Sequence, residues 1–118
     1  MDSKEQQFEK RLQNFSLEII GLCKKIKEDT ISRPIISQII RSATSIGANY
    51  SEANNASSRS DFRNKIFICK KETQETKYWL KLTTSVSDES AKIDELWKEC
   101  NEYSLIFQKI ISTMAANK

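Results

Sequence analysis

Basic residues in the middle of the chain form the most regular chemical pattern in the sequence. Spacings of 7, 7 and 4 residues separate Arg63, Lys70, Lys77 and Lys81. At 3.6 residues per turn, these four side chains share one face of a helix. Such a line of cations can follow a phosphate backbone, with an affinity that falls steeply as salt is added. We therefore predict a nucleic-acid-binding surface here, with Lys71 and Arg41 as flanking members.

Positive charge is concentrated in the same region. Residues 41–81 carry eight basic and four acidic side chains, a net charge of +4. Residues 82–118 carry four and six, a net charge of −2, and residues 1–40 carry seven and six. Repetition of such a surplus around an oligomer would add each copy to one electrostatic field. The alternative is a solvated flank of the core, where lysine stems cover apolar surface.

Catalytic and metal-binding chemistry finds no support in the residue types. The chain has no histidine, so Ser-His and Cys-His nucleophile pairs and the Glu-x-x-His motif of bundle di-iron sites are impossible. No glycine-rich phosphate loop is present. We interpret Glu72 and Glu75, one helical turn apart, as a solvated face. The sequence therefore predicts no catalytic residue, no metal site and no cofactor.

Helices must position the basic line, because the chain has only two glycines and one proline. Apolar residues recur at steps of three and four in four segments, which is typical of amphipathic helices. We expect helices over residues 4–29, 34–53, 61–84 and 91–115, with Ser32 and Ser60 as N-caps of the second and third. Short connections imply antiparallel neighbours. The prediction is an all-α, up-down-up-down, antiparallel four-helix bundle that forms one domain over residues 1–118.

The inner line of each predicted helix is read from the same spacing. The first is Phe8, Leu12, Phe15, Ile19, Leu22 and Ile26, and the second is Ile36, Ile39, Ala43, Ile46, Tyr50 and Ala53. The third is Phe62, Ile66, Cys69, Thr73, Thr76 and Leu80, and the fourth is Ile93, Trp97, Cys100, Ser104, Phe107, Ile111 and Met114. Cys69 and Cys100 then act as small buried hydrophobes.

A second apolar face on the third helix indicates self-association. This face consists of four residues that lie 100–160° around the helix axis from the inner line: Ile68, Trp79, Leu82 and Val86. A helix that is apolar on two faces needs a further partner, and a second copy of the chain supplies one. The alternative is an irregular bundle in which loops cover these residues. The outer face of the second helix leaves a similar choice, because Arg41, Ser45, Asn49 and Glu52 suit either an interface network or ordinary exposure.

The ends and cysteines of the chain indicate its compartment. The first residues are charged and polar, unlike a secretory signal, and no apolar run is long enough to span a membrane. The chain has an odd number of cysteines, Cys23, Cys69 and Cys100, which favours free thiols in a reducing compartment. We expect a cytoplasmic protein.

Three stretches carry a resemblance to a known family. Residues 41–53 read Arg-Ser-Ala-Thr-Ser-Ile-Gly-Ala-Asn-Tyr-Ser-Glu-Ala, residues 60–66 read Ser-Asp-Phe-Arg-Asn-Lys-Ile, and residues 70–80 read Lys-Lys-Glu-Thr-Gln-Glu-Thr-Lys-Tyr-Trp-Leu. Together they resemble the four-helix-bundle proteins encoded by intervening sequences in bacterial large-subunit ribosomal RNA genes. The Gly-Ala-Asn-Tyr-x-Glu-Ala signature is similar to one branch, in which Ala53 replaces the glycine of the commoner form.

The resemblance implies an up-down four-helix bundle and a ring-like homopentamer, with no enzymatic activity. A related accessory protein of diversity-generating retroelements forms a basic pentameric barrel that binds nucleic acid and the reverse transcriptase. Our leading hypothesis is a homo-oligomer, expected to be a pentamer, that binds RNA or DNA through the basic residues without sequence specificity. The alternative is a scaffold or accessory factor for a partner protein such as a reverse transcriptase.

Overall fold

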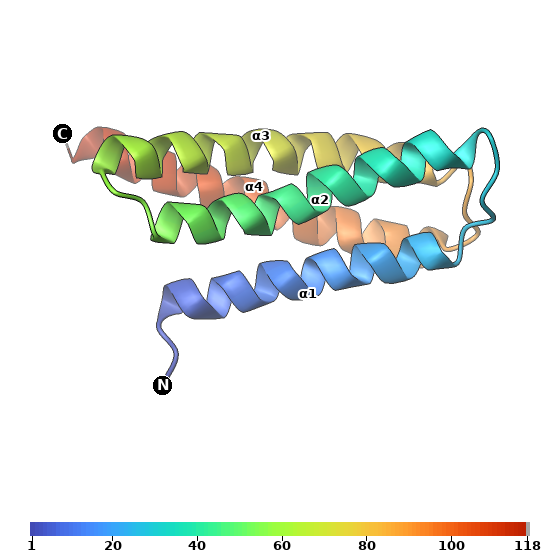
Figure 1. Cartoon of the computed structure of the whole chain (residues 1–118), viewed down its shortest axis with the longest axis horizontal. Coiled ribbons are helices and arrows are strands. Elements are labelled where there is room, and N and C mark those ends of the chain that lie inside the picture. The colour runs from blue at the N-terminus through green and yellow to red at the C-terminus, as the bar shows by residue number, and fades with distance from the viewer. Residues whose placement is uncertain (118) are drawn as a thin grey trace.

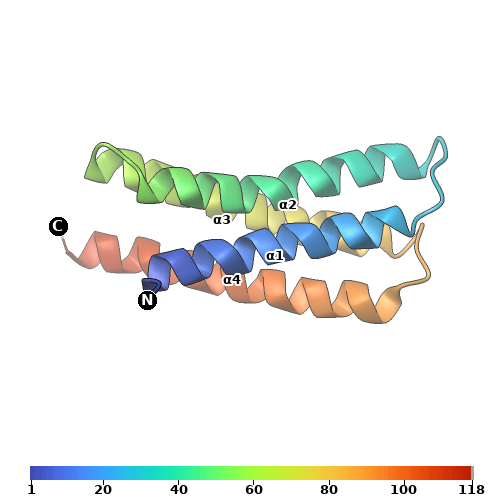
Figure 2. The same ribbon diagram turned by 60° about the horizontal axis from the view of Figure 1, so that its bottom comes forward.

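Four antiparallel helices account for almost all of the structure (Figures 1 and 2). The computed structural model describes residues 1–117, in which the helices are α1 (Lys4–Lys24), α2 (Ser32–Asn54), α3 (Arg59–Thr83) and α4 (Ser90–Ala116). Successive helices run in opposite directions and are joined by short loops at alternate ends of an elongated body of 48 × 28 × 22 Å. The predicted all-α four-helix bundle is confirmed.

Polar side chains begin the first three helices, although not always the predicted ones. Ser3 and Gln6 form a reciprocal capping box at the start of α1. The prediction of Ser32 as an N-cap is wrong, because Asp29 Oδ1 accepts hydrogen bonds from the Ile31 and Ser32 amides at 2.9 and 2.8 Å. These hydrogen bonds lower the pKa of the Asp29 carboxyl. The prediction that the first helix reaches residue 29 is wrong, because α1 ends at Lys24 with Lys25 as its C-cap.

The third helix starts two residues earlier than expected. Ser58 Oγ, rather than Ser60, accepts a hydrogen bond from the Asp61 amide at 3.0 Å. Ser58 and Ser60 both precede Asp61, so residue type alone does not decide which serine is the N-cap. Asp61 lies in the first turn, where its negative charge complements the helix dipole.

The predicted inner lines of α1, α2 and α3 form the core. Three residues that end these lines, Phe8, Ile36 and Phe62, are half-buried and the remainder are buried. The line of α4 differs: Leu96 and Tyr103 are buried, whereas Trp97 lies half-exposed at the edge of the core. Steps of three and four both keep a residue on the inner face. Contacts with α1, including Phe15 against the Tyr103 ring at 5.2 Å, decide in favour of Leu96 and Tyr103.

Small residues bring α2 and α3 close together along their length. Ser42, Thr73 and Thr76 are fully buried between them, and the Thr76 hydroxyl lies 2.9 Å from Ser42 Oγ. The Cys69 thiol donates to the Ile46 carbonyl oxygen at 3.5 Å. Because α4 lies against the opposite flank of α3 (Figure 1), α3 packs between α2 and α4. Its remaining face looks out to solvent.

Candidate nucleic-acid interface

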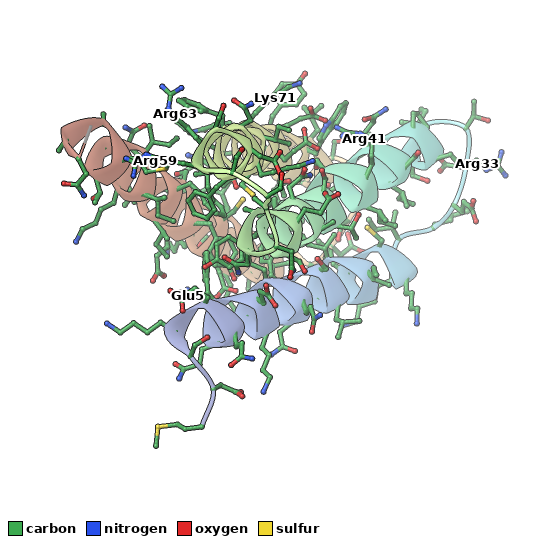
Figure 3. The ribbon with its side chains drawn as sticks, turned by 60° about the vertical axis from the view of Figure 1, so that its left-hand side comes forward. Glu5, Arg33, Arg41, Arg59, Arg63 and Lys71 are labelled. Carbon is green, nitrogen blue, oxygen red and sulfur yellow. The ribbon has the colours of Figure 1, made fainter. Side chains whose placement is uncertain are left out.

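The outer face of α3 presents the predicted line of cations. Figure 3 shows Arg63 and Lys71 pointing away from the bundle on this side. Lys81 is exposed as well, whereas Lys70 and Lys77 are half-buried along the boundary with α4. The structure therefore brings the predicted α3 residues together on one surface. We call Arg63, Lys70, Lys71, Lys77 and Lys81 the α3 cationic face.

Two of these lysines are held over an indole ring. The ammonium groups of Lys77 and Lys81 lie 4.7 and 5.0 Å from the centroid of Trp97. Lys77 Nζ also donates to Asn101 Oδ1 of α4 at 2.7 Å. Cation–π attraction and the amide orient both charges without neutralising them. Trp97 therefore lies at the boundary between α3 and α4, where the two lysine side chains cover part of its ring.

The remaining members are also positioned by neutral groups or by none. Lys70 Nζ donates to Gln108 Oε1 at 2.6 Å, and the Arg63 guanidinium lies 5.0 Å from the centre of the Phe67 ring. Within residues 1–117, no carboxylate lies within 4 Å of a charged nitrogen of the α3 cationic face. Five positive charges are thus left available to an external anion.

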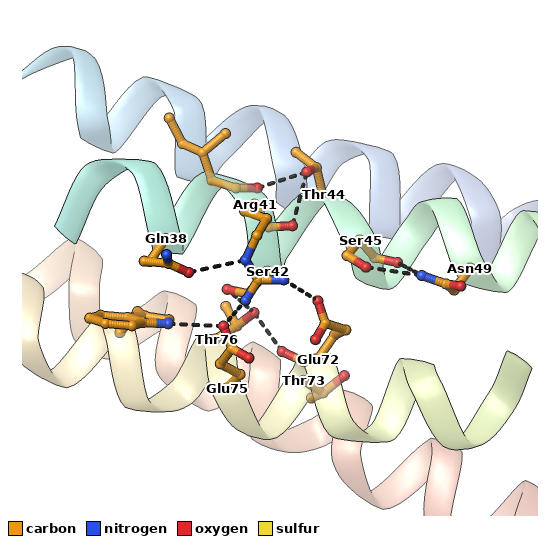
Figure 4. A network of polar contacts seen from close by, with 12 residues as sticks. Gln38, Arg41, Ser42, Thr44, Ser45, Asn49, Glu72, Thr73, Glu75 and Thr76 are labelled. Atoms are coloured by element: carbon orange, nitrogen blue, oxygen red, sulfur yellow. Dashed lines mark hydrogen bonds and ion pairs between the residues drawn. The ribbon is translucent and has the colours of Figure 1, made fainter. Parts of the chain in front are cut away.

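The acidic side chains of α3 do not cancel this charge. Besides Asp61 in the first turn, the helix has Glu72 and Glu75, and both bind Arg41 of α2 (Figure 4). Arg41 Nη1 lies 2.8 Å from Glu72 Oε2, and its Nε donates to Gln38 Oε1 at 3.0 Å. The Trp79 indole nitrogen donates to Glu75 Oε2 at 3.1 Å. These carboxylates therefore face α2, away from the cationic face.

The same network changes the interpretation of two residues. Glu72 is buried, so the prediction of a solvated face is wrong for it, because Arg41 compensates the buried charge. Arg41 was expected to flank the nucleic-acid surface, but its guanidinium is occupied by two carboxylates between α2 and α3 (Figure 4). Asn49 makes only local hydrogen bonds, to Ser45 O and Oγ at 2.8 and 2.9 Å, so it fixes no register between helices.

The predicted self-association residues lie on the opposite flank of α3. Ile68 is 37% exposed, and Trp79, Leu82 and Val86 are half-buried. Trp79 packs partly against the core of its own chain, so it is less free than its position on the helix wheel implied. The chain alone therefore leaves part of this apolar surface uncovered.

Two exposed aromatic residues beside the cations escaped the sequence analysis. Phe67 is 39% exposed and Tyr78 is 58% exposed. Both lie on α3, 11 residues apart, so they share a face of the helix. The signal was present in the sequence, because each aromatic falls between basic residues on the helix wheel rather than near the inner line.

The cysteines offer no reactive site. All three are buried free thiols. Burial raises the pKa of Cys23 to about 11 and that of Cys69 and Cys100 to about 12, which keeps them protonated near neutral pH. Residues 1–117 contain no cluster of three or more potential metal-ligating side chains. In that described part of the chain, no helix has an apolar stretch long enough to cross a membrane.

Comparisons with known proteins agree with this architecture. Residues 4–109 match the model of the 23S rRNA-intervening sequence protein family. Among solved structures, the chain is similar to a protein of unknown function from the S23 ribosomal protein family of Bacteroides thetaiotaomicron, with 35% sequence identity and a TM-score of 0.74. The match covers 87% of this chain and 96% of that one. Among curated proteins, none matches the chain.

Proposed function

This chain belongs to the 23S rRNA-intervening sequence protein family, and from that premise we propose that it is a non-enzymatic homo-oligomer that binds RNA or DNA through the α3 cationic face. One observation carries the proposal. On the solvent-facing side of α3, five cations have no carboxylate of residues 1–117 within 4 Å of their charged nitrogens. Phosphate groups are the anions that such a line fits, because they too are regularly spaced along a strand.

The binding mechanism is charge neutralisation. Each phosphate that pairs with a lysine or arginine releases condensed counterions, so affinity depends on salt rather than on base sequence. The contacts with Trp97, Asn101 and Gln108 hold the cations along the boundary of α3 and α4 before binding. Pre-positioned side chains lose less conformational entropy when they bind.

Self-association uses the other flank of α3. Ile68, Trp79, Leu82 and Val86 keep apolar surface that a second copy would cover. We expect a homopentamer, as the resemblance to ring-forming relatives implies. The interface and the line of Arg63, Lys70, Lys77 and Lys81 then occupy different sides of one helix, so assembly leaves these four cations accessible and multiplies them. Analytical ultracentrifugation tests the oligomer, and a monomer at all micromolar concentrations would contradict it.

The binding test compares two triple variants of equal charge. The first, Arg63→Gln/Lys71→Gln/Lys81→Gln, removes three exposed members of the α3 cationic face. The control, Lys4→Gln/Lys24→Gln/Lys27→Gln, removes three exposed lysines of α1 and its following loop. Fluorescence anisotropy with labelled RNA and DNA is measured over a salt series.

The wild type and the control should bind alike, with steep salt dependence. The α3 variant should bind more weakly, and its plot of log affinity against log salt should be shallower by about 2 to 3, because each phosphate contact contributes roughly 0.7–0.9. Absence of binding by the wild type at low salt, or equal effects of the two variants, would overturn the proposal.

A further inference from the structure

Exposed aromatic rings run beside the cations on α3, and they point to a particular form of nucleic acid. Resting on the proposed function, we propose that the α3 cationic face binds single-stranded nucleic acid, whose bases stack on Phe67 and Tyr78 while its phosphates follow the lysines. Both rings are large and keep part of their surface in contact with solvent. Base–aromatic stacking is the interaction by which proteins commonly hold unpaired nucleotides.

The two kinds of side chain form parallel lines. With Phe62 of the inner line at 0° and 100° per residue, Arg63, Lys70, Lys77 and Lys81 fall at about 60–100°. Phe67 and Tyr78 fall at about 140–160° on the same scale, and Lys71 falls beyond them at about 180°. A strand lying along α3 can therefore contact the cations with its backbone on one side and the rings with its bases on the other.

The contacts of each ring leave it available for stacking. The Arg63 guanidinium lies over one face of the Phe67 ring, 5.0 Å from its centre, so on that side a base would stack on the guanidinium, because guanidinium planes also stack on bases. The Tyr78 ring meets Trp79 edge-on, with centroids 5.1 Å apart and an interplanar angle of 79°, so its faces are not stacked on the indole. Exposed Gln74 lies between the two rings along the helix.

The length of the surface sets the size of the site. Arg63 and Lys81 are 18 residues apart, or about 27 Å at 1.5 Å per residue. At roughly 3.4 Å per stacked nucleotide, this line spans about eight nucleotides of one strand. Duplex nucleic acid offers the same phosphates, but its bases are already stacked on one another and cannot reach the rings. Single strands should therefore gain an interaction that duplexes lack.

The test uses a labelled ten-nucleotide single strand and the duplex of the same sequence. Anisotropy titrations compare the full-length wild type with Phe67→Leu/Tyr78→Leu, which keeps apolar side chains but removes both rings. Leu17→Ala is the control, because Leu17 is 63% exposed on α1, away from this face. Circular dichroism verifies that each variant is folded.

The wild type should prefer the single strand by at least about tenfold. Loss of the rings should weaken single-strand binding by at least about tenfold, as removal of stacking contacts does elsewhere. It should leave duplex binding and the salt slope unchanged, because stacking releases no counterions. Photocrosslinking of a 5-iodouracil strand should attach at Tyr78 or Phe67.

Two failures are distinguishable. Salt-dependent binding by the wild type without preference for the single strand, or without an effect of ring removal, would overturn the stacking proposal and leave the proposed function standing. Absence of salt-dependent binding to either oligonucleotide would overturn both. The Leu17→Ala control should match the wild type, and an equal loss in this variant would also count against the rings.

Discussion

Two arginine–glutamate pairs join helices on opposite sides of the bundle, and they differ mainly in burial. Arg41 of α2 meets Glu72 of α3 at 2.8 Å, where the Glu72 side chain is 7% exposed. Arg11 of α1 meets Glu102 of α4 at 2.9 Å, where the Glu102 side chain is 57% exposed. The same chemistry therefore acts once against a desolvated carboxylate and once in water. Burial, not distance, should decide the importance of each pair.

Side-chain size explains why the glutamate of one pair is buried and that of the other is not. Ser42, Thr73 and Thr76 let α2 and α3 approach closely, so Glu72 is enclosed. Large rings separate α1 from α4: Phe15 packs edge-on against Tyr103 at 5.2 Å, and Arg11 lies 4.9 Å from the Tyr103 ring centre. The wider spacing leaves the ion pairs of α1 and α4 at the surface.

The largest expected effect comes from Arg41→Ala. This change leaves the buried Glu72 carboxylate without its ion-pair partner, so the free energy of unfolding should fall by about 3 kcal/mol. Urea denaturation measures the loss. Arg33→Ala is the control, because Arg33 is exposed and lies 3.5 Å from the exposed Glu28, and it should cost less than about 0.5 kcal/mol.

A second change sharpens the Arg41 result. Glu72→Gln in the Arg41→Ala background removes the uncompensated charge and should restore part of the lost stability. If Arg41→Ala costs no more than Arg33→Ala, the contrast in burial has no energetic meaning. If the double variant is less stable than Arg41→Ala, the loss arises from packing instead of charge.

A smaller, salt-sensitive effect is expected from Arg11→Ala. The pair with Glu102 is solvated, so the loss of unfolding free energy should be about 1 kcal/mol at low salt, including the contact with the Tyr103 ring. At 1 M salt, where the Debye length is about 3 Å, this loss should shrink, whereas that of Arg41→Ala should persist. Urea denaturation at both salt concentrations checks this, with Lys24→Ala as an exposed control. Equal salt dependence of the two arginine variants would remove the distinction between the helix pairs.

The smallest effect is a pH dependence at α1 and α4. The hydrogen bond and charge of Arg11 lower the pKa of Glu102 from its ordinary value of 4.5. A lowered carboxyl pKa adds stability above the unfolded-state pKa and loses it as pH falls through the folded-state pKa. The stability difference between wild type and Arg11→Ala should therefore be constant above about pH 5 and shrink in more acidic solution. Urea midpoints over pH 2–7 measure it, and a difference as large at pH 2 as at pH 7 would contradict the assignment.

Helical periodicity was enough to predict most of the core, and its error at Trp97 is instructive. The line of α4 was drawn through Trp97, whereas Leu96 and Tyr103 are buried. Both choices satisfy a spacing of three or four residues. Only tertiary contacts distinguish the two choices. The Phe15 ring of α1 packs against Tyr103, whereas Lys77 and Lys81 of α3 lie over Trp97.

The candidate surface shows the same limit. Spacing placed Arg63, Lys70, Lys77 and Lys81 on one face, and the structure groups them there. Arg41 was predicted to flank that surface, but ion pairs with Glu72 and Glu75 hold it between α2 and α3. The helix wheel already separates Phe67 and Tyr78 from the inner line, but how far each ring is exposed depends on which helices pack against α3.

The sequence by itself determined four amphipathic helices, their antiparallel order and a basic line on the third, because these properties depend on local spacing and short connections. Tertiary structure alone decided which charges are neutralised, which carboxylate is buried and which rings stay in contact with water. Those outcomes depend on distances between helices, and the distances follow from the side chains that meet across them. Small residues drew α2 and α3 together around one ion pair, while the outward face of α3 kept its cations without a carboxylate partner from residues 1–117.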